Sequence, residues 1–372
     1  MPPLPTGTPD SLGFDAERLR QAESLLQRWI ETDRVPAAAL CVGRNGRALP
    51  PRLFGRQRPE AGAPAIRPDA LFLIASITKP ITATAVVMLA ERGLLSLHDR
   101  VADLIPDFAR NGKQDVRIHH LLTHISGLPD MLPENLRLRR SHQPLSAFVE
   151  GTCRLIPSFR AGTAVTYQSM GFAILAELVH QASGRLLPQF LAQEVFAPLG
   201  MDDTSLGWHP DRRERIAAIR TPPDQGADWG WNSPYWLGLG VPWGGLITSP
   251  ADLARFCLMM LGGGALGNTR ILSSAAVRAM TTNQLAMMPE IPEVERRSRP
   301  WGLGWRLNWP GQPNTFGDLL GPRSYGHWGA TGTLCWLDPD ANAFMILFTT
   351  QPLEADGRLL TPVSNLVASA IR

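Results

Sequence analysis

Lysine is almost absent from this 372-residue chain, and one of its two lysines, Lys79, follows Ser76 by three positions. A lysine amine can lose its proton when it is desolvated, whereas an arginine guanidinium stays charged. A neutral amine beside a serine can make the serine hydroxyl nucleophilic. Ser76 and Lys79 therefore form the first candidate pair for covalent catalysis, although serine is common enough for this spacing to arise by chance.

The residues around this pair predict a helix that places both side chains on one face. Residues 81–89 are almost continuously apolar, and Pro80 suits the first turn of a helix. We expect the helix to begin at about Ser76 and to end at Gly93. Residues three apart share a helical face, so the Lys79 amine can reach the Ser76 oxygen. The unpaired N–H groups of the first turn would also stabilise negative charge.

A serine nucleophile needs a base and an oxyanion hole, and two further segments could supply them. Tyr167 lies in a loop before an expected helix, and its phenolate could take the serine proton if a lysine lowered its pKa. The alternative is a packed tyrosine with a hydrogen-bonded hydroxyl. The glycine-rich stretch 325–332 could offer the N–H of Ala330, together with that of Ser76, to an oxyanion. Here the alternative is a bulge or turn without a ligand.

The composition is that of an ordinary globular protein, with 44% hydrophobic and 19% charged residues and a net charge of +3. We expect one large domain or two interleaved domains. No basic stripe with interleaved aromatic residues occurs, so nucleic acid is not an expected partner. No apolar run approaches the roughly 18–20 residues that span a bilayer. The N-terminus lacks the features of a signal peptide, and the four cysteines are widely spaced, so we expect a cytoplasmic protein with reduced thiols, although a chain that had lost a leader would look the same.

The expected elements change type along the chain. Strands are expected at 37–42, 52–55, 301–309, 324–328, 332–337 and 344–349. Helices are expected at 15–32, 171–182 ending at Gly184, 187–196 ending before Pro198, from Ser249 to 262, and 359–371. Because strands lie at both ends and helices between them, we predict an α/β (α+β) fold. Residues 1–65 and 265–372 would form a sheet domain, and residues 66–264 an inserted, mostly helical domain with the site at the interface.

Other motifs weigh against metal and cofactor chemistry. His119, His120 and His124 could suggest zinc, but Leu121 stands where the glutamate of H-E-x-x-H would be. Structural histidines are the favoured interpretation, so we expect neither a metal nor an organic cofactor. No G-x-S-x-G elbow, phosphate loop or dinucleotide fingerprint occurs. A tryptophan cluster in a Gly/Pro-rich stretch could be core or the apolar wall of a ligand pocket. It comprises Trp229, Trp231, Trp236 and Trp243.

Taken together, these motifs resemble the serine β-lactamase-like superfamily: class C β-lactamases, D-Ala-D-Ala peptidases and family VIII carboxylesterases. Beyond Ser76-x-x-Lys79, the resemblance includes Leu-Leu-Thr-His-Ile-Ser-Gly-Leu at 121–128 and Gly162-Thr163 before Tyr167. It also includes Gly-Gly-Leu at 244–246 through Asp-Leu-Ala at 252–254, and covers nearly the whole chain. The resemblance implies an antiparallel sheet flanked by helices, with an inserted helical domain.

The resemblance also implies roles for the candidate residues. Ser76 would be the acylated nucleophile, and Lys79 and Tyr167 would share the general-base work. The N–H groups of Ser76 and Ala330 would hold the oxyanion. His124 would be a structural signature residue and not a ligand.

Two departures from the family pattern bear on the substrate. Tyr167-Gln168-Ser169 stands where the family often has Tyr-x-Asn, and a serine hydroxyl has fewer donors than an amide. His327-Trp328-Gly329 stands where lactamases and peptidases have Lys-Thr-Gly, and histidine is mostly neutral at pH 7. Both changes weaken recognition of an anionic amide, and the esterase branch commonly has such replacements. The expected substrate-binding residues are Ser169, Trp243, His327, Trp328 and Gly329.

The sequence thus predicts a serine hydrolase, a carboxylesterase that cleaves small to medium esters through a Ser76 acyl-enzyme. The tryptophan-rich wall favours uncharged acyl groups, and the only expected partner is a small-molecule ester. The natural substrate and the oligomeric state are not readable from the sequence. Alternatives on the same machinery are a β-lactamase, a D-amino-acid peptidase, an amidase and an acyltransferase. A catalytically silent binding protein is less favoured, because all three catalytic side chains are retained.

Overall fold

The computed structural model describes residues 4–222, 225–309, 316–354 and 358–372. Its main sheet has seven strands in the order β2-β1-β12-β11-β10-β9, with β3 paired to β1, and every pairing is antiparallel. These strands are β1 (Ala37–Arg44), β2 (Arg47–Ala48), β3 (Arg52–Gly55), β9 (Arg306–Leu307), β10 (Tyr325–Gly329), β11 (Thr333–Asp338) and β12 (Ala343–Thr349). The predicted fold class, an antiparallel sheet flanked by helices, is confirmed.

The centre of the sheet joins the two ends of the chain. β1 pairs with β12 over a register that runs from Ala38 opposite Thr349 to Arg44 opposite Ala343. Both strands are buried almost throughout, because they are covered on both faces. This explains why they read as continuous apolar runs and not as alternating patterns. The prediction that both termini contribute strands to one sheet is confirmed.

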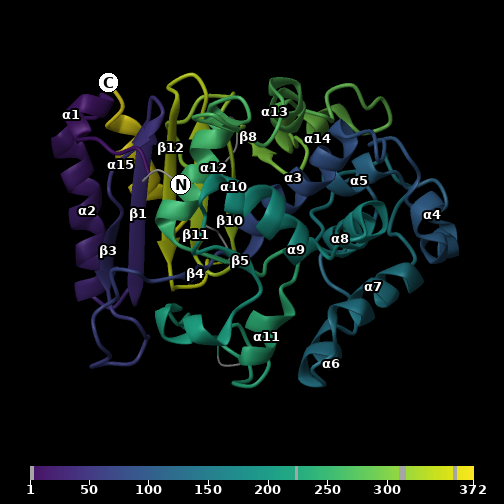
Figure 1. Ribbon diagram of the computed structural model, residues 1–372, viewed down its shortest axis with the longest axis horizontal. Coiled ribbons are helices and arrows are strands. Elements are labelled where there is room, and N and C mark those ends of the chain that lie inside the picture. The colour runs from purple at the N-terminus through teal and green to yellow at the C-terminus, as the bar shows by residue number, and fades with distance from the viewer. Residues whose placement is uncertain (1–3, 223–224, 310–315, 355–357) are drawn as a thin grey trace.

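Two helices cover one face of this sheet, as Figure 1 shows on its left side: α2 (Ala16–Glu31) and α15 (Thr361–Ser369). Asp15 caps α2 by accepting hydrogen bonds from the N–H groups of Glu17 and Arg18. The apolar stripe of α2, which includes Leu19, Leu26 and Trp29, belongs to the same hydrophobic core as residues of the main sheet.

Most of the other helices lie on the opposite side of the sheet (Figure 1). They include α3 (Thr78–Glu91), α5 (Ile118–Leu122), α7 (Leu145–Arg154), α8 (Met170–Ser183) and α12 (Pro250–Leu261). α12 packs directly on β1 and β12. As predicted, the Ser249 hydroxyl caps α12 by accepting from the N–H of Asp252 at 3.2 Å, with Pro250 in the first turn. The division of the chain into domains at 65 and 264 stays a prediction.

The remaining elements are short and connect these layers. The helices are α1 (Pro9–Leu12), α4 (Val101–Leu104), α6 (Asn135–Arg140), α9 (Leu187–Leu191), α10 (Ala197–Leu199), α11 (Pro234–Leu239), α13 (Ser274–Thr281) and α14 (Glu293–Ser298). A small sheet combines β4 (Phe72–Leu73), β6 (Leu246–Thr248) and β5 (Ser205–Leu206), and β7 (Ala265–Leu266) pairs with β8 (Thr269–Arg270). Among the described residues, no helix combines the length and apolar character needed to cross a bilayer.

Two sequence-based boundaries differ most from the structure. The helix expected to stop before Pro198 passes through a π-helical turn at 192–196 and continues to Leu199. It ends at Gly200, whose φ of +67° suits the left-handed cap position. The strand expected over 301–309 is formed only at Arg306–Leu307, because its pairing with β10 covers only Tyr325 and Gly326.

Candidate active site

Ser76 lies in a 3₁₀ turn, residues Ala75–Ile77, that links β4 to α3. The regular helix thus begins at Thr78, two residues later than predicted. The Thr78 hydroxyl explains this start, because it donates to the Ala75 carbonyl at 2.7 Å and accepts from the N–H of Leu246 at 3.0 Å. The turn is therefore tied to β6, whose first residue, Leu246, is the last residue of the Gly-Gly-Leu motif.

The backbone before Ser76 is held in an uncommon conformation. Ala75 has a φ of +45°, in the left-handed region that costs a non-glycine residue about 1–3 kcal/mol. Neighbouring strands hold it there, since the Thr333 hydroxyl donates to the Ile74 carbonyl at 2.9 Å. β10 also approaches closely, and a Cβ added to Gly329 would lie 2.3 Å from the same carbonyl oxygen. The expected close backbone approach of this glycine-rich strand is confirmed.

Lys79 is fully buried behind Ser76. Its Nζ lies 3.1 Å from Ser76 Oγ and 3.1 Å from the backbone oxygen of Trp243. Burial lowers the pKa of Lys79 to about 7, because desolvation penalises the ammonium form, while the Asp130 carboxylate acts in the opposite direction. A neutral amine is therefore well populated at neutral pH, within hydrogen-bond distance of the serine oxygen.

Tyr167 stands over the same pair, with Lys79 Nζ 4.7 Å from its ring centroid. Burial raises the pKa of Tyr167 well above its ordinary value, and a hydrogen bond with Ser76 opposes this only in part. The tyrosine is consequently a neutral phenol, which disagrees with the sequence-based idea of a phenolate. The reason is that burial penalises the charged phenolate, and the negative charge of Asp130 raises the pKa of Tyr167 further.

The residues after Tyr167 point in different directions. Gln168 is buried, and its side-chain amide donates to the Leu121 carbonyl at 3.0 Å. Its N–H donates to Nδ1 of His124, whose ring stacks on Tyr167 at 4.8 Å. The Ser169 hydroxyl instead donates to Asp130 Oδ1 at 2.6 Å. The 121–128 motif thus positions Tyr167 through His124.

Asp130 is a site residue that the sequence analysis missed. It lines the same cavity as Ser76 and accepts the hydrogen bond from Ser169. The available signal was its place two residues after the 121–128 motif. A carboxylate here adds negative charge beside Lys79, which nothing in the Ser-x-x-Lys or Tyr-x-Asn patterns foretells.

The β10 residues supply no positive charge at the position where the Lys-Thr-Gly pattern would place a lysine. Burial lowers the pKa of His327 to about 3, so the ring is neutral at pH 7, as the sequence suggested. Its Nδ1 lies 2.8 Å from the backbone oxygen of Trp328. The Trp328 ring stacks on Tyr167 at 6.2 Å between centroids. This wall is therefore aromatic and uncharged.

A cavity of about 540 Å³ opens over these residues. Six of the predicted site residues line it: Ser76, Tyr167, Ser169, Trp243, Trp328 and Ala330. Lys79, His327 and Gly329 are buried behind this lining. The structure therefore brings the predicted catalytic and substrate-binding residues to one place, with Ala330 directly after β10.

The three neighbouring histidines face separate partners. His120 Nδ1 accepts from the N–H of Arg117 at 3.1 Å, whereas His124 Nδ1 accepts from Gln168. The ring of His119 stacks on His98 at 5.7 Å. Burial lowers the pKa of both His119 and His120 to about 4. Each ring thus has a packing or hydrogen-bonding role of its own.

Comparison with known proteins identifies the family to which this chain belongs. The model of the family described as Beta-lactamase matches residues 22–368. The chain belongs to the beta-lactamase family. A relative from Escherichia coli (strain K12), provisionally named a D-alanyl-D-alanine carboxypeptidase, is 25% identical over 94% of this chain and 86% of its own length.

Solved structures share the fold of this beta-lactamase-family protein. A penicillin-binding protein homologue from Caulobacter crescentus has a TM-score of 0.77 and 21% identity over 96% of this chain and 97% of its own. A family VIII carboxylesterase has a TM-score of 0.76 and 24% identity over 96% and 98%. A LovD6 mutant of simvastatin synthase from Aspergillus terreus has a TM-score of 0.74 and 21% identity over 95% of each chain.

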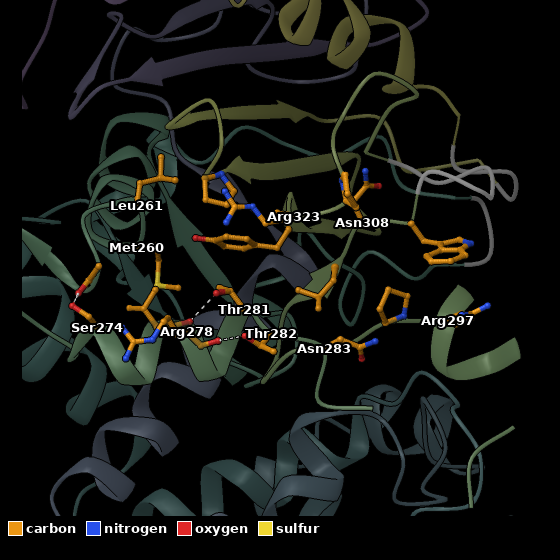
Figure 2. A pocket seen from close by; sticks show the side chains of 18 residues that line it. Met260, Leu261, Ser274, Arg278, Thr281, Thr282, Asn283, Arg297, Asn308 and Arg323 are labelled. Carbon is orange, nitrogen blue, oxygen red and sulfur yellow. Dashed lines mark hydrogen bonds between the residues drawn. The ribbon is translucent and has the colours of Figure 1, made fainter. Parts of the chain in front are cut away.

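A second and larger cavity of this beta-lactamase-family protein lies away from Ser76. Figure 2 shows it, with a volume of about 740 Å³, between α12, α13 and the edge strand β9. Its labelled side chains include Met260, Leu261 and Asn308, together with Arg278 and Arg323. None of the predicted site residues lines it.

Proposed function

We propose that this protein is a serine hydrolase that cleaves carboxylic esters through an acyl-enzyme on Ser76. The observation that carries the proposal is the buried Lys79 amine, 3.1 Å from Ser76 Oγ and with a pKa of about 7. A base whose pKa lies near the working pH is the most effective proton acceptor. Membership in the beta-lactamase family supports the serine-hydrolase class.

In the proposed first half-reaction, neutral Lys79 takes the proton of Ser76 as Oγ attacks the ester carbonyl. The N–H groups of Ser76 and Ala330 stabilise the tetrahedral oxyanion, each contributing roughly 3–4 kcal/mol. The Lys79 ammonium then returns the proton to the leaving alkoxide, with the Tyr167 hydroxyl relaying it. The alcohol leaves and an acyl ester remains on Ser76.

In the second half-reaction, a water molecule attacks the acyl-enzyme from the cavity. Lys79 is neutral again and removes the proton of this water, directly or through Tyr167. Collapse of the second tetrahedral intermediate expels Ser76 Oγ, which recovers its proton, and releases the carboxylic acid. The same three side chains thus serve both halves.

Two features support an ester over an amide. The neutral His327 stands where lactamases and peptidases have lysine, and Ser169, which replaces the family's asparagine, is engaged by Asp130. An ester needs less help from such groups, because an alcohol leaves more readily than an amine. The likeness to a family VIII carboxylesterase agrees with this preference.

The test is turnover of p-nitrophenyl acetate and butyrate by the purified protein. Ser76→Ala should lose this activity, and a fluorophosphonate probe should add to Ser76, as read by mass spectrometry. Ser274→Ala is the matched control, because this exposed serine lies at the larger cavity. Undiminished turnover in Ser76→Ala would refute the nucleophile, and failure to label Ser76 would favour a silent binding protein.

The relatives support a second candidate on the same residues. Those provisionally named D-alanyl-D-alanine carboxypeptidases favour amide or lactam hydrolysis. The likeness to EstCE1, described as a hydrolase with promiscuous acyltransferase activity, favours transfer to an alcohol or amine. Turnover of nitrocefin at a rate comparable to that of p-nitrophenyl butyrate would select amide or lactam hydrolysis. Product formed with an added alcohol in preference to water would select acyl transfer.

A further inference from the structure

The cavity over Ser76 has a cation in its wall that the mechanism does not use. Arg139, on α6, is only 8% exposed and lines this cavity. Its guanidinium carbon lies 4.1 Å from the ring centroid of Trp236 and 5.0 Å from that of Trp229. One nitrogen, Nη2, donates to the backbone oxygen of Trp229 at 3.1 Å. The two indoles and this bond hold the group in place.

This arginine has no anionic partner in the described part of the chain. Its Nε is buried without a hydrogen-bond partner, and Nη2 is the guanidinium nitrogen with a hydrogen bond. Burying a cation without a counter-ion is unfavourable, and stacking on two indoles offsets only part of this cost. Burial lowers the pKa of Arg139 to about 10, so the group remains charged at neutral pH. Among the described residues, the wall of the Ser76 cavity therefore holds a positive charge without a counter-ion.

Other polar atoms in the same wall also lack partners. Asn135, one helical turn before Arg139, lines the cavity, and its Oδ1 is buried without a hydrogen bond among the described residues. The indole Nε1 atoms of Trp236 and Trp243 are in the same condition, and both rings line the cavity. Buried polar groups are normally hydrogen-bonded, so these unpaired atoms around one cavity are available to pair with a bound ligand.

The two carboxylates among the described residues that line the cavity, Asp130 and Glu354, do not neutralise Arg139. Asp130 accepts the hydrogen bond of Ser169, and both Asp130 and Glu354 are exposed to solvent. Neither forms an ion pair with Arg139, although all three line one cavity of about 540 Å³. An anionic ligand would therefore be drawn to the α6 side and away from these two carboxylates.

We propose that Arg139 binds a carboxylate carried by the substrate, so that the preferred ester is anionic, such as a monoester of a dicarboxylic acid. This inference rests on the proposed esterase function and replaces the sequence-based preference for uncharged acyl groups. That preference came from the loss of the family lysine and from the tryptophans. The structure supplies a cation from α6 instead of β10.

The experiment compares esters of equal length that differ in charge. The first pair is p-nitrophenyl hexanoate and p-nitrophenyl hydrogen adipate, which carries the carboxylate on the acyl half. The second pair is phenyl acetate and 4-acetoxybenzoate, which carries it on the alcohol half. In Arg139→Met, the ratio of kcat/KM for the anionic ester to that for its neutral partner should fall at least about tenfold in one pair.

Two further variants sharpen the result. Arg139→Lys keeps the positive charge, so its ratio of kcat/KM for the anionic ester to that for the neutral ester should lie between those of Arg139→Met and the unaltered protein. Arg137→Met, at an exposed position on the same helix, should leave both ratios at the wild-type value. Ratios that stay unchanged in Arg139→Met for both pairs overturn the inference. Absence of turnover of all four esters, anionic and neutral, by the unaltered protein would instead count against the proposed function.

A measurement on the unaltered protein covers the case in which Arg139→Met does not fold. Adipate should inhibit hydrolysis of p-nitrophenyl hexanoate competitively, and adipamide, its neutral diamide, should do so at least about tenfold more weakly. Equal inhibition by both compounds would overturn the inference without any variant.

Discussion

The two cavities of this protein differ more in their walls than in their size. The larger, about 740 Å³, is bordered by arginines that are exposed, and one of them, Arg323, pairs with Asp340. The smaller, about 540 Å³, lies over the fully buried Lys79 and includes the buried Arg139 in its wall. Volume alone would select the wrong one. A buried ionisable group next to a nucleophile is the better guide to chemistry.

The difference arises from how each wall is built. The smaller cavity lies where a turn, a strand end and a loop converge, so Lys79 behind it is desolvated. The turn that carries Ser76 is fixed by hydrogen bonds such as that from Thr333 to Ile74. The larger cavity lies beside the short edge strand β9, and the arginine side chains that line it are exposed to solvent. Desolvation lowers the pKa of Lys79, and solvated arginines cannot act as bases.

The largest expected effect tests the role of the lysine in the smaller cavity. Lys79→Arg should lower kcat/KM for p-nitrophenyl butyrate at least about 1000-fold, because a guanidinium stays charged and cannot take the serine proton. Arg278→Lys, in the larger cavity, is the matched control and should retain activity. A loss of less than about tenfold in Lys79→Arg would show that another group is the base.

Tyr167→Phe should have the next largest effect. It removes the hydroxyl that relays protons but keeps the ring that stacks on His124, so a loss of about 100-fold in kcat is expected. Thermal unfolding of the variant should match the parent. Activity within about twofold of the parent would reduce Tyr167 to a packing role.

The pH profile should report the buried amine. Because Lys79 acts in its neutral form, kcat/KM should rise about tenfold per pH unit up to about 7 and level off above it. Asp130→Asn should move the midpoint to lower pH, since the carboxylate favours the ammonium form and raises this pKa. A midpoint that moves upward in Asp130→Asn would contradict the assignment.

The smallest effect is expected from filling the larger cavity. Val277→Phe places a ring in that space and should leave kcat/KM for p-nitrophenyl butyrate within about twofold of the parent. Met131→Phe, the matching change in the smaller cavity, should alter kcat/KM more strongly for longer acyl chains than for acetate. A larger response to Val277→Phe than to Met131→Phe would reverse the comparison.

The sequence predicted those features that depend on local chemistry. Helical spacing located α2, the Ser249-Pro250 start located α12, and three-residue spacing paired Ser76 with Lys79. Local patterns could not give the burial that keeps Tyr167 protonated, because burial depends on segments distant in the sequence. Asp130 and Arg139 were missed for the same reason.

The contact between β10–β11 and the turn at Ser76 has a consequence for the newly made chain. The Thr333 hydroxyl and the Ile74 carbonyl that it binds are 259 positions apart, and Ala330 lies on the same distant hairpin. A ribosome must finish that hairpin before the serine acquires its full surroundings. The surroundings of this hydroxyl are therefore complete only when the chain has been made at least as far as Thr333.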